Sequence, residues 1–180
     1  IDTPGFANGL ECYGDYLVIA DYNDGIAIMD VNPPESASIV QTIATTQSCS
    51  VQIEGNYAYV TDYVDGMYIV DMSNPESAYS VNTMPMEQAR KHYVKNRYAY
   101  VPCWDHTVRV IDVDPPESAY IVNETSTTYL AQDFVIDGNL GYFLAHGELQ
   151  ILDLTNPESA EIIQAVPAGV AISLDYHDGY

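Results

Sequence analysis

Apolar and polar residues alternate along this chain in short runs that turn residues separate. Within residues 50–83 the runs are SVQIE, YAYVTD, MYIVD and AYSVNT, and each is rich in β-branched or aromatic side chains. The sequences GN, DG and NPES lie between them. Gly, Asn and Asp tolerate the backbone of tight turns and proline cannot donate a backbone hydrogen bond, so these sequences are typical of hairpins and loops. The pattern predicts four short antiparallel strands.

The same unit occurs four times. A Pro-Glu-Ser-Ala sequence recurs every 41 residues, and so does an aspartate just before it, at Asp30, Asp71, Asp112 and Asp153. The first unit predicts strands at 8–13, 16–21, 26–30 and 37–43. The repeats are expected over residues 3–43, 44–84, 85–125 and 126–166, with a partial fifth at 167–180. We expect the repeated aspartate to cap the following loop through its carboxylate and not to act in catalysis.

Four antiparallel strands in about 40 residues are typical of one β-propeller blade. We therefore predict an all-β fold, with residues 1–180 forming a single β-propeller domain or part of one. ISLDYHDGY at 172–180 repeats NGLECYGDY at 8–16, so it reads as the first strand of a fifth blade. Two interpretations stay open, because exposed strand edges are normally covered. The blades belong to a larger ring, or they form an arc that other chains complete.

The segment GNYAYVTDYVDGMYIVDMSNPESA at 55–78 resembles the LVIVD-type propeller repeat, and residues 2–40 show the same pattern. The resemblance implies the propeller fold and a secreted or surface-exposed protein, and it brings no common catalytic residues. We expect an extracellular or cell-surface location, with the periplasm as an alternative. A glycosylation-type triplet at Asn123-Glu124-Thr125 is consistent with that setting.

Charge narrows the range of partners. The chain has 26 Asp and Glu against five Lys and Arg, a formal charge of -21. Nucleic-acid binding needs a broad cationic face and is not expected. No apolar run is long enough for a membrane span. Cys12, Cys49 and Cys103 form neither a disulfide framework nor a zinc motif, and the repeat phase places the first two too far apart to bridge.

All five cations lie in the third repeat, which also holds the single Trp. In this repeat His92 occupies the first-strand position that holds the apolar residues Leu10, Val51 and Leu174 elsewhere, and CWDHT replaces the turn DYVDG. Structural ion pairing, a patch that docks a partner, and a small anion site all stay open as explanations. The predicted binding residues are Arg90, Lys91, His92, Lys95, Arg97, Trp104, His106 and Arg109.

Two turns bear a carboxylate at each end and are calcium candidates, through Asp21 and Asp24 and through Asp62 and Asp65. Hairpin turns explain the same sequences more simply, so no cofactor is predicted and calcium stays an alternative. His92, His106, His146 and His177 form no metal-binding sequence pair. His92 and His177 fall on first strands, where both would approach a propeller channel, but a third ligand is not identifiable.

The chain has no nucleophile elbow, phosphate loop or dinucleotide fingerprint. Our leading hypothesis is a non-enzymatic extracellular or cell-surface repeat protein that mediates protein or glycan interaction or assembly, including self-association. The alternative is a subunit of a periplasmic or secreted enzyme or redox complex, with its site at the channel mouth around His92 and His177. A structural unit of a surface layer is a third hypothesis.

Overall fold

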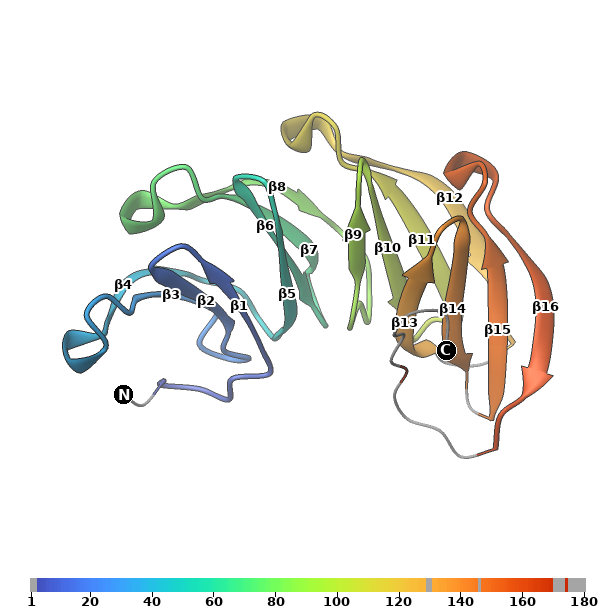
Figure 1. Cartoon of the computed structure of the whole chain (residues 1–180), viewed down its shortest axis with the longest axis horizontal. Helices are drawn as coiled ribbons and strands as arrows, with labels where there is room; N and C mark the ends of the chain where they lie inside the picture. Colours follow the sequence, from blue (N-terminus) through green and yellow to red (C-terminus); the bar gives the residue numbers. More distant parts are fainter. Residues whose placement is uncertain (1–2, 129–130, 146, 170–173, 175–180) are drawn as a thin grey trace. The chain divides into compact units, whose positions relative to one another are not determined.

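The computed structural model describes residues 3–128, 131–145, 147–169 and 174. It contains four antiparallel sheets of four strands, each with its strands in chain order (Figure 1). We call them blades 1 to 4. Blade 1 consists of β1 (Gly9–Tyr13), β2 (Tyr16–Ala20), β3 (Ile26–Asp30) and β4 (Ser38–Ile43); blade 2 of β5 (Ser48–Glu54), β6 (Tyr57–Asp62), β7 (Gly66–Asp71) and β8 (Tyr79–Met84).

Blades 3 and 4 repeat this arrangement. Blade 3 consists of β9 (Tyr93–Lys95), β10 (Tyr98–Cys103), β11 (Thr107–Asp112) and β12 (Tyr120–Ser126); blade 4 of β13 (Ala131–Asp137), β14 (Leu140–Ala145), β15 (Glu148–Asp153) and β16 (Glu161–Pro167). The Pro-Glu-Ser sequences form single 3₁₀ turns at η1 (Pro34–Ser36), η2 (Pro75–Ser77), η3 (Pro116–Ser118) and η4 (Pro157–Ser159). These turns are the helices of the described residues, and none is long enough to cross a membrane.

The propeller-blade prediction is confirmed strand by strand. In blade 1 the observed strands differ from the predicted ones by one residue at most at either end. The exception in length is β9, which has only three residues and begins just after His92. The sequence predicted His92 within this strand, and the shortening leaves it immediately outside. The fifth first strand expected at 172–180 lies outside the described residues apart from Leu174.

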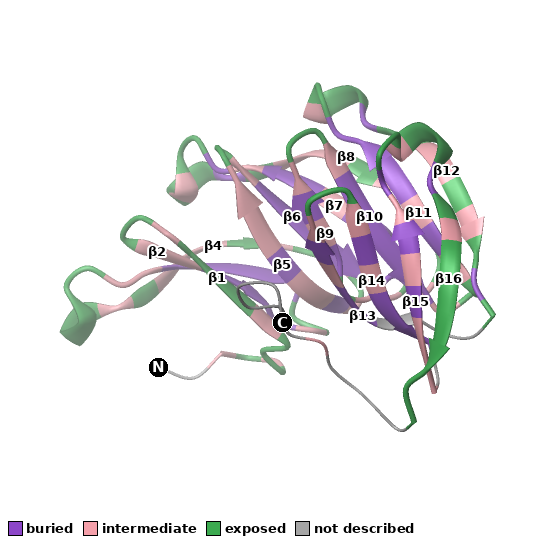
Figure 2. Cartoon of the chain, turned by 45° about the vertical axis from the view of Figure 1, so that its right-hand side comes forward, coloured by how far each residue is buried: buried purple, intermediate pink, exposed green. Residues whose placement is uncertain are grey.

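The chain divides into two compact units. Unit 1 contains residues 1–89 and 115–118, and unit 2 contains residues 90–114 and 119–180. In unit 1, Val18 and Ile28 of blade 1 share an apolar cluster with Val60 and Met72 of blade 2. In unit 2, aromatic rings hold the corresponding cluster together, with the centroids of Tyr100 and Phe134 5.9 Å apart. Figure 2 shows the buried residues concentrated along the middle strands of the blades.

The repeated aspartate caps its loop, as predicted. In each blade its Oδ1 accepts a hydrogen bond from the backbone N–H two residues later, with N···O distances of 2.8–3.1 Å for the pairs Asp30–Asn32, Asp71–Ser73, Asp112–Asp114 and Asp153–Thr155. The hydrogen bond from Ser73 lowers the pKa of Asp71, and the one from Thr155 does the same for Asp153. These carboxylates therefore have a structural role in closing the loop between the third and fourth strands.

Candidate interaction surface

The cations of blade 3 are largely paired with carboxylates of their own unit. Lys91 Nζ lies 3.0 Å from Asp133 Oδ1, and the Lys91 side chain is 57% exposed although Asp133 is buried. Arg97 Nε donates to Asp112 Oδ1 at 2.9 Å, and its second nitrogen bonds to the other oxygen of that carboxylate. The hydrogen bond from Arg97 lowers the pKa of Asp112. Part of the positive charge of this repeat is therefore neutralised by carboxylates of the same unit.

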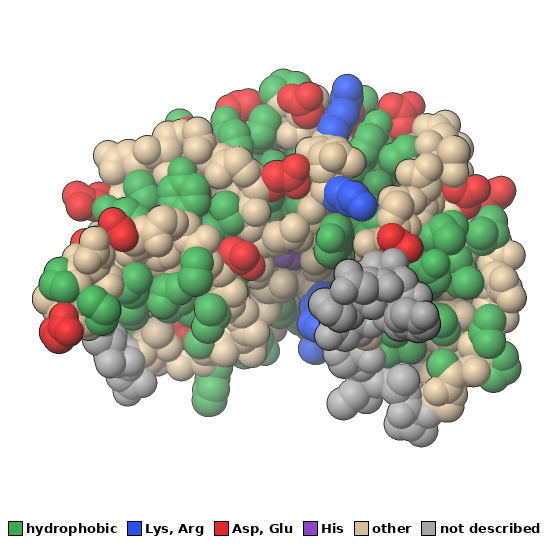
Figure 3. Space-filling model, in the orientation of Figure 1, with side chains coloured by type: hydrophobic (Ala, Val, Ile, Leu, Met, Phe, Trp, Pro, Cys, Tyr) green, Lys and Arg blue, Asp and Glu red, His purple; other side chains and the backbone are tan. Residues whose placement is uncertain are grey.

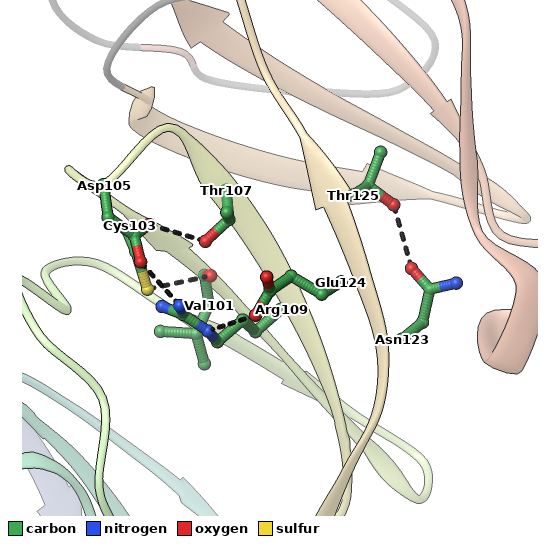
Figure 4. A network of polar contacts seen from close by, with 8 residues as sticks. All are labelled: Val101, Cys103, Asp105, Thr107, Arg109, Asn123, Glu124 and Thr125. Carbon is green, nitrogen blue, oxygen red and sulfur yellow. Dashed lines mark hydrogen bonds and ion pairs between the residues drawn. The ribbon is translucent and has the colours of Figure 1, made fainter.

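Arg109 is the centre of the polar network in Figure 4. It lies on β11, where its side chain is only 13% exposed. Its Nε donates to Glu124 on the facing strand β12 at 2.9 Å, and a terminal nitrogen donates to Asp105 at 2.5 Å. Thr107 Oγ1 donates to the other oxygen of Asp105 at 2.6 Å. Burial opposes the charge of Arg109, but the hydrogen bond to Asp105 outweighs it and the pKa of Arg109 is raised.

Two further cations differ in their surroundings. The guanidinium carbon of Arg90 lies 3.8 Å from the centroid of the Trp104 ring, which is a cation–π contact. Lys95, at the end of β9, forms no ion pair with any described residue and is half-buried. In the view of Figure 3, the visible Lys and Arg side chains lie in one region of the surface, whereas Asp and Glu side chains are scattered over it.

Of the four histidines, the structure describes His92 and His106. His92 is buried at 8% exposure, and His106 lies in the exposed turn between β10 and β11 with a positive φ of 68°. His146 and His177 lie outside the described residues. Among the residues that are described, no group of three His, Cys, Asp or Glu side chains is placed to hold a metal ion.

The Asp-rich turns use their carboxylates as acceptors for the backbone. Asp62 is fully buried and accepts hydrogen bonds from the N–H groups of Val64, Asp65 and Gln47. Asp21 accepts one from Gly5 at 3.0 Å. The hydrogen bond from Thr46 outweighs burial and lowers the pKa of Asp65. The structure thus accounts for these turns as hairpins, the reading that the sequence favoured; the calcium alternative stays a prediction.

In blade 3, Cys103 takes the position that Asp62 has in blade 2. It is fully buried, its thiol lies 3.6 Å from the carbonyl oxygen of Val101, and burial raises its pKa to about 11. All three cysteines are free. Cys103 is therefore a packing residue, and the turn beyond it depends on Asp105 and Arg109 instead of a buried carboxylate.

Sequence reasoning missed a second set of contacts, which links consecutive repeats. An amide side chain of the fourth strand donates to a carbonyl in or next to the following 3₁₀ turn: Gln41 to Ala78 and Asn82 to Pro116 in unit 1, and Asn123 to Glu158 in unit 2. The N···O distances are 2.9–3.3 Å. The signal was present, because these amides are spaced 41 residues apart like the Pro-Glu-Ser-Ala sequence.

Comparison with protein families gives one match. Residues 4–45 and 46–82 each match the LVIVD repeat. Among curated proteins, no sequence matches this chain. The two matched segments correspond to blades 1 and 2, so blades 3 and 4 are assigned to the same kind of repeat by their 41-residue phase and their strand order.

Solved structures share the fold at low sequence identity. The periplasmic gluconolactonase PpgL of Pseudomonas aeruginosa aligns with a TM-score of 0.76 at 15% identity, over 92% of this chain and 57% of that one. The computationally designed protein Ika4 aligns with a TM-score of 0.72 at 8% identity, over 85% of this chain and 94% of Ika4. The designed Ika8 aligns at 0.62 and 8%, over 96% of this chain and 65% of Ika8.

Proposed function

Since this chain is an LVIVD-repeat protein with β-propeller blades, we propose that it is a non-enzymatic interaction module acting outside the cytoplasm, whose blade 3 contacts an acidic surface on a protein partner. The observation that carries the proposal is the position of Lys95. Lys95 forms no ion pair with a carboxylate among the described residues, on a chain whose formal charge is -21.

The half-exposed side chains of Lys91 and Arg97 also support this proposal. Each is held by a buried carboxylate, which fixes the position of the cation while part of it faces solvent. Ordered, half-exposed cations on an anionic body favour one orientation of an acidic partner and speed its approach. A contact of this kind weakens as salt is added, because the screening length falls from about 30 Å at 0.01 M to about 3 Å at 1 M.

The test uses poly-L-glutamate as a probe of acidic surfaces and the Lys95→Gln variant. Binding is measured by fluorescence anisotropy of the labelled probe in about 0.01 M and about 1 M salt. We expect the wild-type chain to bind at low salt only, and Lys95→Gln to bind about two- to fivefold more weakly, as for one exposed ion pair. Charge reversal at Lys91 or Arg97 is a poorer test, since it leaves a buried carboxylate unpaired and endangers the fold.

The matched control is Thr83→Glu, which lowers the net charge by the same amount at an exposed position in blade 2. If Thr83→Glu weakens binding as much as Lys95→Gln, net charge alone governs binding and the proposal is wrong. Probe binding that is unchanged between low and high salt contradicts it as well.

A second candidate function rests on the fold shared with PpgL, a periplasmic gluconolactonase. By that likeness the chain would be a periplasmic enzyme acting on a sugar lactone. Hydrolysis of gluconolactone releases acid and is followed directly by titration at constant pH. Turnover well above the rate without protein would favour this candidate over the interaction module.

A further inference from the structure

The fourth strands of blades 1, 2 and 3 each carry side chains that contact the following repeat. Besides the amide donors Gln41, Asn82 and Asn123, this contact surface contains an apolar residue one position earlier. Val40 packs into the apolar cluster of unit 1, and Val122 packs into that of unit 2. Two positions after the amide, Thr125 Oγ1 donates to Ala160 O at 2.7 Å. We call this set the donor face.

In blades 2 and 4, the opposite side receives these groups from the preceding blade of the same unit. The residue after each Pro-Glu-Ser turn is buried in three blades, with exposures of 2% for Ala78, 8% for Ala119 and 4% for Ala160. The residue after the capping aspartate is also buried there, as in Met72, Val113 and Leu154. A first-strand apolar residue completes this side in blade 2, where Val51 is 7% exposed. We call this set the acceptor face.

Blade 1 presents an acceptor face that is not covered. Leu10 occupies the position of Val51 and is 62% exposed. Val31 and Ala37 occupy the positions of the buried residues just described, yet both are only half-buried. They pack on Ile19, Ala27 and Met29 in a cluster formed by blade 1 alone. Blade 1 therefore has the apolar residues of an acceptor face, but no described residues cover them in the way that blade 1 covers the acceptor face of blade 2.

Blade 4 presents the matching donor face, and its side chains are exposed in the part of the chain that the structure describes. Gln164 repeats the amide of Gln41, 123 residues or three repeats later, and is exposed where the other three amides are half-buried. Ile163 and Val166 repeat Val40 and Ile43, and they are 53% and 39% exposed. Figure 2 shows β16 largely in the colour of exposed residues.

We infer that the donor face of blade 4 binds the acceptor face of blade 1 of a second copy of this chain. Ile163 and Val166 would cover Leu10 and Val31, and the Gln164 amide would donate to a carbonyl next to Pro34–Ser36, as Gln41 does to Ala78. A second copy is the occupant because the chain itself carries the partner surface, with the side chains that form this contact repeatedly inside it. The two faces differ, so the contact is heterologous and builds a ring or a filament.

This contact responds to salt in the opposite sense to the one proposed for blade 3. Its groups are apolar or neutral, whereas two chains of formal charge -21 repel each other. Added salt screens the repulsion and strengthens apolar association. Failure of one proposal is therefore distinguishable from failure of the other.

The experiment measures the association of the full chain by sedimentation velocity at moderate salt over a range of concentrations. Ile163→Glu damages only the donor face and Leu10→Glu only the acceptor face, and both side chains are exposed, so the fold should tolerate them. We expect each variant to weaken association at least tenfold. Thr83→Glu adds the same charge to a fourth strand away from both faces, and it should associate like the wild type.

Mixing the two variants gives the decisive result. Each retains one intact face, so an equimolar mixture should form a dimer and stop there, whereas each variant alone should associate at least tenfold more weakly than the wild type. A wild-type chain that stays monomeric at every concentration overturns the inference, and so does a mixture that fails to form the dimer. Closure of blade 4 on blade 1 of the same chain would give a monomeric wild type and would overturn it too.

Discussion

Blades 2 and 3 have the same four strands, but the turn between their second and third strands is held in two different ways. In blade 2, the buried carboxylate of Asp62 accepts three backbone N–H groups. In blade 3, Cys103 takes that position, and the turn is held by Asp105 through Thr107 and Arg109. The backbone of a blade is therefore compatible with either a buried acceptor or an ion pair nearer the surface.

Blades 2 and 3 also differ at a second position near this turn. At the repeat position of Arg109, blade 2 has Tyr68, whose hydroxyl donates to Asp65 at 2.9 Å. A neutral hydroxyl suffices there because Asp65 also accepts from the backbone N–H of Thr46. Blade 3 has Cys103 in place of the buried carboxylate, and the guanidinium of Arg109 bonds to both Asp105 and Glu124. At least one cation of blade 3, Arg109, therefore has a structural role in holding the turn of its own blade.

The largest expected effect concerns the thiol of Cys103, which occupies in blade 3 the position that Asp62 has in blade 2. A thiol with a pKa of about 11 is almost entirely protonated at pH 8. Its thiolate fraction is then roughly two-hundredfold lower than that of an ordinary cysteine with a pKa of about 8.5. We expect Cys103 to react with a disulfide reagent at least a hundredfold more slowly than exposed Cys12, in chains where the other two cysteines are changed to Ser.

Unfolding in urea provides the control for this measurement. Once the chain is unfolded, both cysteines should react at similar rates, because burial is the first cause of the raised pKa. Rapid modification of Cys103 in the folded chain would show that blade 3 opens at this turn and that the thiol is not simply a packing residue.

The next effect compares alanine at the same position in the two blades. Asp62→Ala removes the acceptor of three backbone N–H groups, and we expect the free energy of unfolding to fall by about 3 kcal/mol, since water can reach part of this turn. Cys103→Ala removes a small apolar group and should lower it by about 1 kcal/mol. Urea unfolding followed by circular dichroism measures both. Equal losses would mean that Asp62 contributes through packing and not as an acceptor.

Much of this arrangement follows from sequence because it is local or repeated. Alternation and the turn residues predict the strands, and Asp71 caps a loop two residues away. The pairing of Arg109 with Glu124 could also have been predicted, since Glu124 lies directly opposite Arg109 in the strand register. The partner of Lys91 was not, because Asp133 belongs to another sheet of the same unit, and its approach depends on how two sheets pack. The shortening of β9 has no local signal either.

The smallest effect tests whether the ion pairs of blade 3 act as charges. Burial opposes ionisation of Asp105, but hydrogen bonds from Thr107 and Arg109 outweigh it and lower its pKa. The stabilisation is then fully present above the unfolded carboxyl pKa of about 3.9 and is lost as the pH falls through the lower folded pKa. We expect Arg109→Gln to lower the free energy of unfolding by about 1 kcal/mol at neutral pH, because Asp105 and Glu124 are partly exposed and screened by solvent.

The difference between wild type and Arg109→Gln should therefore shrink below about pH 4, and it should also shrink in about 1 M salt. Tyr68→Phe is the matched control in blade 2, because it removes one neutral donor at the same repeat position and should give a difference that salt does not change. If salt affects both variants alike, the guanidinium acts only as a hydrogen-bond donor. The cations of blade 3 would then be interchangeable with neutral side chains, and their concentration in one repeat would have to be explained by contacts outside the blade.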